Sequence, residues 1–271
     1  MRSGATRWTS RRNAIAGATV LATATALGFA AMAPQATPPP EATDLADGLP
    51  PPVAPAFRPG APRRLASTRH LSHWAPVERS APVRAAPDSG ARLLTMLSPW
   101  TPERTRNIVT VLEHRLDAAG PTWVRVALAM LPNGSTGWVR RSALGGYGTV
   151  ETQLVVDLRS LRATLYRRGQ PILHAPVGVG SERWPTPRGT YYVRSKLTRY
   201  RSPSYGPLAF GTSARSPAAT GWPAGRFVGI HGTDRPDLLP GRISHGCIRM
   251  RNADILALER HMPVGTPITI H

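Results

Sequence analysis

The sequence of 271 residues holds a single cysteine, Cys247. One thiol excludes an internal disulfide, and the absence of CxxC and HExxH spacing argues against a zinc site. We therefore expect no metal and no cofactor. A lone cysteine is most often a small buried hydrophobic residue. However, Cys247 stands between His245-Gly246 and Ile248-Arg249, and histidine, glycine and arginine are poor core residues. These neighbours favour a reactive thiol.

Acidic residues are also scarce: 15 Asp and Glu stand against 34 Lys and Arg, which gives a formal net charge of +19. Such a balance suits nucleic acid or an anionic surface. The basic residues are mostly arginines, scattered along the chain, and no zinc-finger or helix-turn-helix spacing is present, so we expect no nucleic acid. Anionic cell-wall polymers remain candidate partners, with the alternative that the arginine content reflects the genome.

Charged residues are absent from residues 14–33, which follow Thr9-Ser10-Arg11-Arg12-Asn13. A basic start, an apolar run and small residues up to Ala33 predict an export signal over residues 1–33, and the paired arginines resemble the twin-arginine type. The alternative is an uncleaved anchor, because about twenty residues can span a bilayer; only then would a membrane be a partner. We expect an exported protein of the periplasm or cell wall, where an unpaired thiol suggests either pairing with another molecule or a reactive group.

Aromatic and β-branched residues are almost absent from residues 34–62, where Pro38-Pro39-Pro40 and Pro50-Pro51-Pro52 stand. Such a segment cannot bury a core and predicts an extended, polyproline-like spacer. We place a disordered linker at residues 34–74.

Residues 75–148 predict a small β domain. Strand-like runs cover residues 92–97 and 123–128, and Asn133-Gly134 is a strong hairpin signal. Residues 105–119 place Ile, Val and Leu at helical spacing before Gly120-Pro121, so a helix competes there with strand and loop.

Two tryptophan-containing runs of this region, residues 123–126 and 133–139, together with residues 142–144, are similar to bacterial Src-homology-three-like barrels of wall proteins. The resemblance implies peptide or wall binding. Trp123 and Trp138 fit a core position equally, because large aromatic side chains are usually buried.

Residues 149–271 read as mainly β. Residues 153–158 and 163–166 form an expected strand pair, and residues 267–270 an expected last strand that closes the sheet. One helix is predicted from Asp254 to His261, capped by Asn252, with its apolar positions facing inward: Ile255, Leu256 and Leu258. Residues 205–211 suit either an apolar wall beside the thiol or core.

A thiol needs help to become a nucleophile, since at a pKa of about 8.5 little thiolate exists at neutral pH. Two candidate bases are close in sequence, His245 and His231, and this combination suits nucleophilic acyl transfer. Gly246 would let a substrate backbone approach, and bare N–H groups there could hold an oxyanion. Spacing alone leaves open which histidine is the base.

The run Ile230–Thr233, followed by Pro236, Gly241 and then Ser244–Met250, resembles the active-site signature of the L,D-transpeptidases, the YkuD-like cysteine enzymes that cross-link bacterial peptidoglycan. The likeness continues upstream through residues 155–158 and 186–191 and covers roughly residues 150–271. It implies a YkuD-like β-sandwich with a short supporting helix, preceded here by the small β-barrel-like domain.

By this resemblance, Cys247 is the nucleophile and His231 its base, with the Gly232 carbonyl holding the ring. The same resemblance places the substrate-binding residues beside the nucleophile: Ser244, His245, Gly246 and Arg249. Arg249 suits a solvated surface charge as well. One departure is Arg251-Asn252, since some members place the asparagine earlier.

The implied reaction transfers an acyl group from a tetrapeptide stem to an acceptor amine. The alternatives are an L,D-carboxypeptidase that uses water and a catalytically inactive wall-binding protein.

Overall fold

The computed structural model describes residues 63–64, 71–117, 120–198, 202–216 and 225–271. All of these described residues belong to one compact unit. The expected export signal and most of the expected linker lie outside the described residues. Within the described ranges, no helix has the length and apolar character needed to cross a membrane.

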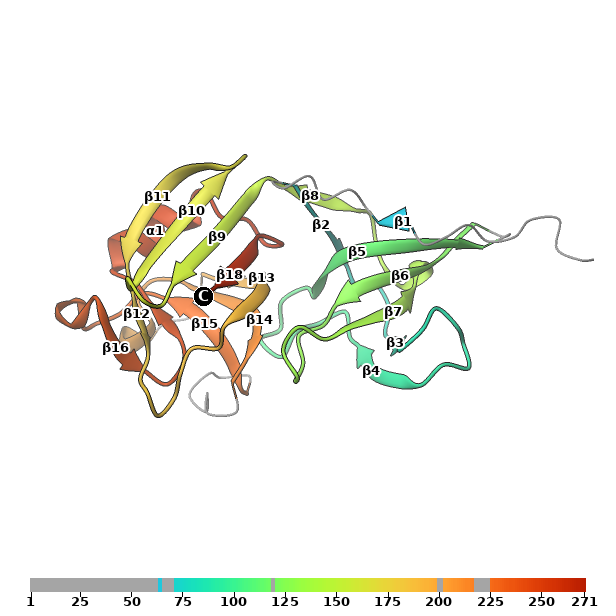
Figure 1. The fold of residues 1–271 in the computed structure, drawn as a ribbon, viewed down its shortest axis with the longest axis horizontal. Helices are drawn as coiled ribbons and strands as arrows, with labels where there is room; N and C mark the ends of the chain where they lie inside the picture. The colour runs from blue at the N-terminus through green and yellow to red at the C-terminus, as the bar shows by residue number, and fades with distance from the viewer. Residues whose placement is uncertain (1–62, 65–70, 118–119, 199–201, 217–224) are drawn as a thin grey trace, which may run out of the picture. The chain divides into compact units, whose positions relative to one another are not determined.

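The first part of the described chain is an antiparallel sheet (Figure 1). Its strand order is β4-β3-β7-β6-β5-β2-β8, and β1 pairs with β5. The strands are β1 Arg63–Arg64, β2 Ser72–Pro76, β3 Ala81–Arg84, β4 Leu93–Leu97, β5 Ile108–Asp117, β6 Gly120–Ala127, β7 Thr136–Arg140 and β8 Gly148–Val150. Alternate side chains along these strands fill a separate core, which includes Val83, Val124 and Val139.

The helical spacing in residues 105–119 proved misleading. Within it, residues 108–117 form β5, which pairs with β2 on one side and β6 on the other. Three β-branched residues at its start fit a pleated surface and are buried: Ile108, Val109 and Val111. Cross-strand pairing therefore overrides the spacing, and Gly120-Pro121 opens the next strand. Trp123 and Trp138 are both buried, as a core position requires.

The second part is a ten-stranded sheet in the order β11-β10-β9-β18-β13-β14-β15-β17-β12-β16. Its strands are β9 Thr152–Asp157, β10 Arg162–Arg167, β11 Gln170–Pro176, β12 Gly178–Gly180, β13 Gly189–Leu197, β14 Ala209–Arg215, β15 Phe227–His231, β16 Gly241–Ser244, β17 Ile248–Arg249 and β18 Pro267–Ile270. The helix α1 covers Asn252–Glu259. Among the described residues, short 3-10 turns cover Pro203–Tyr205 and Pro236–Leu238 in this part and Arg141–Ala143 between β7 and β8.

The sheet curls around a single core that it shares with α1 (Figure 1). Leu154 of β9, Phe210 of β14, Ile230 of β15 and Leu258 of α1 belong to this cluster. The expected last strand has the predicted bounds, but it lies between β9 and β13 and thus inside the sheet. The mainly β fold class is confirmed.

The helix departs from its expected details. Arg251 occupies the N-cap position without a side-chain cap, so the cap predicted for Asn252 is wrong. Asn252 is the first helical residue, and its side-chain oxygen accepts the N–H of Thr233 at 3.0 Å instead. Leu256 is 39% exposed, whereas Ile255 and Leu258 are buried as predicted.

Candidate functional site

Two neighbouring strands bring the sequence-predicted residues together. β15 and β17 pair in parallel, with Ile230 opposite Ile248 and His231 opposite Arg249. Ile230 and Ile248 point into the main core. Because side chains alternate along a strand, their neighbours face the other side of the sheet. That face therefore carries Phe227, Gly229 and His231 of β15. It also carries Arg249 of β17 and Cys247, which directly precedes β17.

Cys247 is half-buried on this face. Its Sγ accepts the backbone N–H of Gly229 at 3.4 Å. Burial raises the pKa of the Cys247 thiol, and the Gly229 N–H and the Arg249 charge offset only part of this rise. At neutral pH the thiol is therefore protonated, and a nearby base must remove its proton for it to attack.

His231 is only 2% exposed. Its Nδ1 lies 2.6 Å from the Gly232 carbonyl oxygen. A carbonyl can only accept, so Nδ1 carries the hydrogen and Nε2 is left as an acceptor. Burial, opposed by the Gly232 hydrogen bond and assisted by the Arg249 charge, lowers the pKa of His231 to about 4. The Tyr205 ring lies against the imidazole at 4.3 Å between centroids. His231 is thus neutral at pH 7 and able to take a proton.

The turn that presents Cys247 is fixed from both sides. Gly246 has φ +111, which side chains rarely adopt. Ser244 Oγ accepts the Gly246 N–H at 3.1 Å and donates to the Cys247 carbonyl at 2.6 Å. Thr186 Oγ1 donates to the Gly246 carbonyl at 2.9 Å and accepts the Gly180 N–H at 2.8 Å. No role was predicted for Thr186, although it lies in the stretch that carries the upstream likeness.

The other two predicted residues, His245 and Arg249, make none of these turn contacts. His245 is exposed, and its ring lies 4.1 Å from that of Trp184, tilted by 47°. The Arg183 guanidinium lies 4.8 Å from the same tryptophan ring. Arg249 is half-buried, and within the described residues its Nε is buried without a hydrogen-bond partner. The buried imidazole on the strand beside Cys247 is therefore His231, while His245 faces Trp184.

Asn252 packs beside the loop that follows His231. A Cβ at Gly232 would lie 2.3 Å from Asn252 Oδ1 and 3.1 Å from Gly206 Cα, so only glycine fits there. The departure seen in the sequence at Asn252 thus falls on a residue that packs beside the loop after His231. No pattern in the sequence indicated this contact.

Residues 205–211 contribute to the core and also lie beside the thiol and His231. Leu208 and Phe210 belong to the main core. Tyr205 lies on His231, and Ala209 forms a small cluster with Phe227 against which Cys247 packs.

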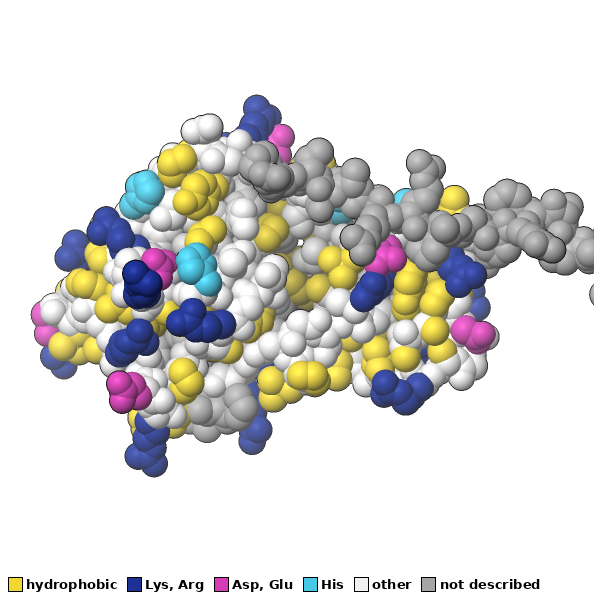
Figure 2. Space-filling view, in the orientation of Figure 1, with side chains coloured by type: hydrophobic (Ala, Val, Ile, Leu, Met, Phe, Trp, Pro, Cys, Tyr) yellow, Lys and Arg dark blue, Asp and Glu magenta, His cyan; other side chains and the backbone are white. Residues whose placement is uncertain are grey.

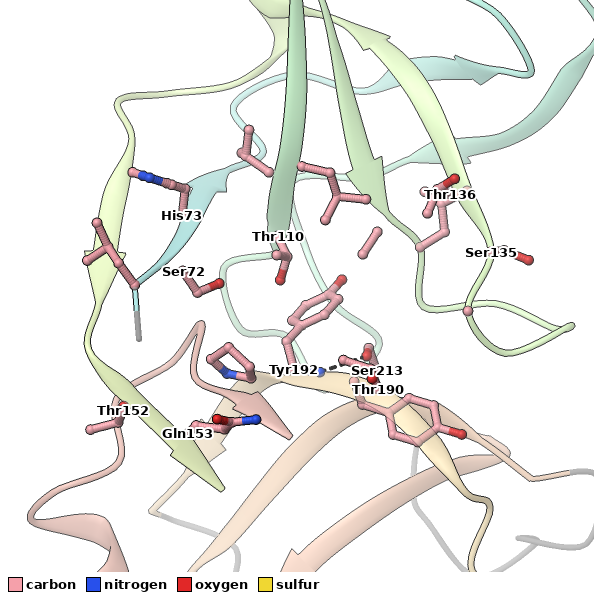
Figure 3. Close-up of a pocket in the computed structure, with 18 residues that line it drawn as sticks. Ser72, His73, Thr110, Ser135, Thr136, Thr152, Gln153, Thr190, Tyr192 and Ser213 are labelled. Atoms are coloured by element: carbon pink, nitrogen blue, oxygen red, sulfur yellow. Dashed lines mark hydrogen bonds between the residues drawn. The ribbon is translucent and has the colours of Figure 1, made fainter. Parts of the chain in front are cut away.

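A cavity of about 430 Å³ is lined by residues of both sheets (Figure 3). The Tyr192 ring points into it towards Thr110, and the Tyr192 N–H donates to Ser213 Oγ at 3.1 Å. None of the sequence-predicted site residues lines this cavity, so it is separate from the thiol. Among the described residues, no group of three or more His, Cys, Asp and Glu is placed to hold a metal.

The matches to known proteins described here cover the second sheet. The family model described as the L,D-transpeptidase catalytic domain, YkuD, matches residues 151–270. A candidate L,D-transpeptidase of Bacillus licheniformis, YkuD, is 33% identical over 122 residues, which are 45% of this chain and 67% of that protein. Its Bacillus subtilis 168 counterpart is 32% identical over 123 residues, 45% of this chain and 68% of that protein.

Solved structures give similar matches. The structure of the Ldtfm-avibactam carbamoyl enzyme is 27% identical, with a TM-score of 0.36, over 44% of this chain and 48% of that chain. Bd1075 of Bdellovibrio bacteriovorus is 27% identical, with a TM-score of 0.37, over 45% and 48%. The matched part of this chain thus spans about half the length of these solved chains.

The matched range carries a cysteine and a histidine on adjacent parallel strands, within a mainly β sheet. The chain belongs to the L,D-transpeptidase family, whose members are cysteine-dependent enzymes.

Proposed function

We propose that this protein is an exported L,D-transpeptidase that cross-links peptidoglycan through an acyl-enzyme on Cys247. The observation that carries the proposal is the pairing of the Cys247 strand with the strand of His231, whose Nδ1 is held by Gly232. The buried imidazole presents an acceptor nitrogen on the same face as the thiol. This is the arrangement that nucleophilic catalysis by a thiol requires.

In the first half-reaction, the Cys247 sulfur attacks the acyl carbonyl of a tetrapeptide stem while its proton passes to His231. The tetrahedral intermediate then expels the terminal D-alanine, whose amine takes that proton. In the second half-reaction, an amine of another stem attacks the thioester, loses its proton and frees the thiol. Water in place of the amine would make the enzyme an L,D-carboxypeptidase.

The protonation states support a neutral starting pair. A raised thiol pKa and an imidazole pKa of about 4 keep both groups uncharged at neutral pH. Proton transfer must then accompany attack, and a positioned base contributes about 10²–10⁴-fold in rate. Since the Gly246 N–H already binds Ser244 Oγ, an oxyanion would have to use another backbone N–H nearby, such as that of Cys247.

The remaining predicted residues fall into two groups with different proposed roles. Ser244 and Gly246 act on the geometry of the turn, because their polar groups bind each other and the chain. His245 and Arg249 are assigned to the stem peptide, Arg249 to a carboxylate. His245 is exposed, and the buried Nε of Arg249 has no hydrogen-bond partner among the described residues.

Residues 75–148, which form most of the first sheet, are assigned as a Src-homology-three-like wall-binding domain. Residues 149–271 are assigned as the catalytic domain. The two predicted tryptophans of the first of these domains, Trp123 and Trp138, are buried and belong to its core, so binding would use other residues. Figure 2 shows Lys and Arg side chains in several separate places with acidic and hydrophobic side chains between them, which suits diffuse attraction to anionic wall polymers.

Product analysis separates the candidate reactions. The full chain is incubated with disaccharide-tetrapeptide, and products are identified by liquid chromatography and mass spectrometry. Equal amounts of free D-alanine and cross-linked dimer support a transpeptidase, and D-alanine with monomeric tripeptide supports a carboxypeptidase. Intact protein that releases no D-alanine would be an inactive wall-binding protein. Release must vanish in Cys247→Ala and fall steeply in His231→Ala, while the matched variant His245→Ala should keep the proton-transfer step.

A further inference from the structure

A carboxylate from the first sheet pairs with a buried arginine in the second. Glu103 lies between β4 and β5, and its Oε1 is 2.5 Å from Nη2 of Arg194 in β13. Both side chains are only 3% exposed. A buried charge without its partner is strongly unfavourable, so each of these groups requires the other.

Arg194 is placed by an irregularity of β13. The register between β13 and β14 shifts between Val193 and Ser195, and such a bulge re-aims a side chain. Its guanidinium carbon lies 3.9 Å from the centre of the Phe227 ring. The guanidinium of Arg215 lies 4.4 Å from the same ring.

Phe227 is the first residue of β15, the strand whose Gly229 N–H contacts the Cys247 sulfur. It lies two residues before Gly229, whose N–H binds the Cys247 sulfur, and four before His231. Phe227 and Ala209 form a small apolar cluster, and Cys247 packs against that cluster. Ala129 of the first part of the chain packs against it as well.

A second contact reaches the same place. The Asn133 side chain donates to the Arg215 carbonyl at 2.7 Å and accepts the Arg215 N–H at 2.9 Å. Arg215 is paired with Phe227 across β14 and β15. Two loops of the first part of the chain thus reach Phe227 indirectly, Glu103 through Arg194 and Asn133 through Arg215.

Charge explains why Glu103 matters here. Arg194 and Arg215 share one aromatic ring, and burial together with the charges of Arg194 and Arg226 lowers the pKa of Arg215. Glu103 supplies a negative charge within this group. Without it, the buried Arg194 guanidinium and the half-buried Arg215 guanidinium would repel each other over Phe227.

We propose that Glu103 is a positioning residue for the thiol: by pairing with Arg194 it holds Phe227, and through Phe227 it fixes the strand that carries Gly229 and His231. The first sheet then completes the active site in addition to any wall binding. This proposal concerns the thiol and its strand, and it holds whichever acyl acceptor the enzyme uses.

The test uses the full chain and the variant Glu103→Gln. Glu78→Gln is the matched control, because it removes the exposed Arg106–Glu78 pair of the same sheet, at 2.6 Å. Hydrogen exchange followed by mass spectrometry should show lost protection in β15 with β9 and β10 unchanged. Equal loss in all three strands would mean that Glu103 supports only global stability, and it would overturn the proposal.

Alkylation of Cys247 by iodoacetamide across pH provides the readout at the thiol. Loss of the Gly229 N–H contact should move the midpoint of the profile upward in Glu103→Gln, with Glu78→Gln at the wild-type midpoint and Glu103→Asp partly restored. A downward move would show that the unpaired Arg194 acts by charge alone, and an unchanged midpoint that β15 is independent of Glu103. Either result refutes positioning.

A second variant covers the case in which Glu103→Gln does not fold. Phe227→Leu keeps the ion pair but removes the ring that links it to β15, so it should also raise the alkylation midpoint. Stem-peptide acylation should fall with it, since a misplacement of about 1 Å can cost about 10²-fold in rate. A Phe227→Leu protein with wild-type alkylation and acylation would contradict the proposed link.

Discussion

Acidification should destabilise this protein through one buried imidazole. The ordinary pKa of histidine is 6.5, and burial lowers that of His231 to about 4. Between these values the unfolded chain binds a proton that the folded protein does not bind. The stability that depends on neutral His231 is therefore complete above pH 6.5 and is lost as the pH falls towards 4. At about 1.36 kcal/mol per pH unit, the loss amounts to about 3 kcal/mol.

Urea unfolding at about pH 7.5 and about pH 4.5 measures this effect directly. The wild-type protein should lose about 2.5 kcal/mol more than His231→Gln over this interval, which ends just above the folded pKa of about 4, since the variant lacks the titrating ring. His245→Gln, which removes an exposed imidazole from the same site, should follow the wild-type curve. If the wild type and His231→Gln lost stability in parallel, the buried neutral imidazole, and with it the assignment of the base, would be untenable.

Three further predictions follow from the turn and from the loop behind His231. Gly246→Ala forces a side chain onto φ +111 and should cost about 1–3 kcal/mol in thermal unfolding, whereas Gly146→Ala, with open space around it, should be near neutral. Thr186→Val removes two hydrogen bonds of the turn and should slow Cys247 alkylation, with Thr186→Ser restoring the rate; equal rates in all three proteins would count against a role in the turn. Asn252→Ala leaves the Thr233 N–H without its partner and should lower acylation, and unchanged acylation would limit Asn252 to packing.

The reactive residues could be predicted from the sequence more easily than the residues that hold them in place. A glycine and a histidine before a lone cysteine, with a second histidine upstream, carry the reactive groups within a short span of chain, so Cys247, His231 and Gly232 could be proposed from residue types and resemblance. The contacts of Thr186 and Asn252 could not, because each joins segments that are distant in sequence and uses a residue type that is common in turns and caps.

The same limit explains the errors in the fold. In residues 108–117 the apolar positions match a helix, but pairing with β2 and β6 on both sides decides for a strand. Asn252 has the composition of a helix cap, yet its side chain binds the backbone of Thr233. The Glu103–Arg194 pair joins residues 91 positions apart, and no local pattern marks it.

The acyl-enzyme is the central claim, and mass spectrometry of the protein after brief exposure to a tetrapeptide stem tests it most directly. The account predicts an adduct with the mass of the stem less its terminal D-alanine, located by peptide fragmentation on Cys247 and absent from Cys247→Ala. An adduct on any other residue, or one that persists in Cys247→Ala, would contradict it.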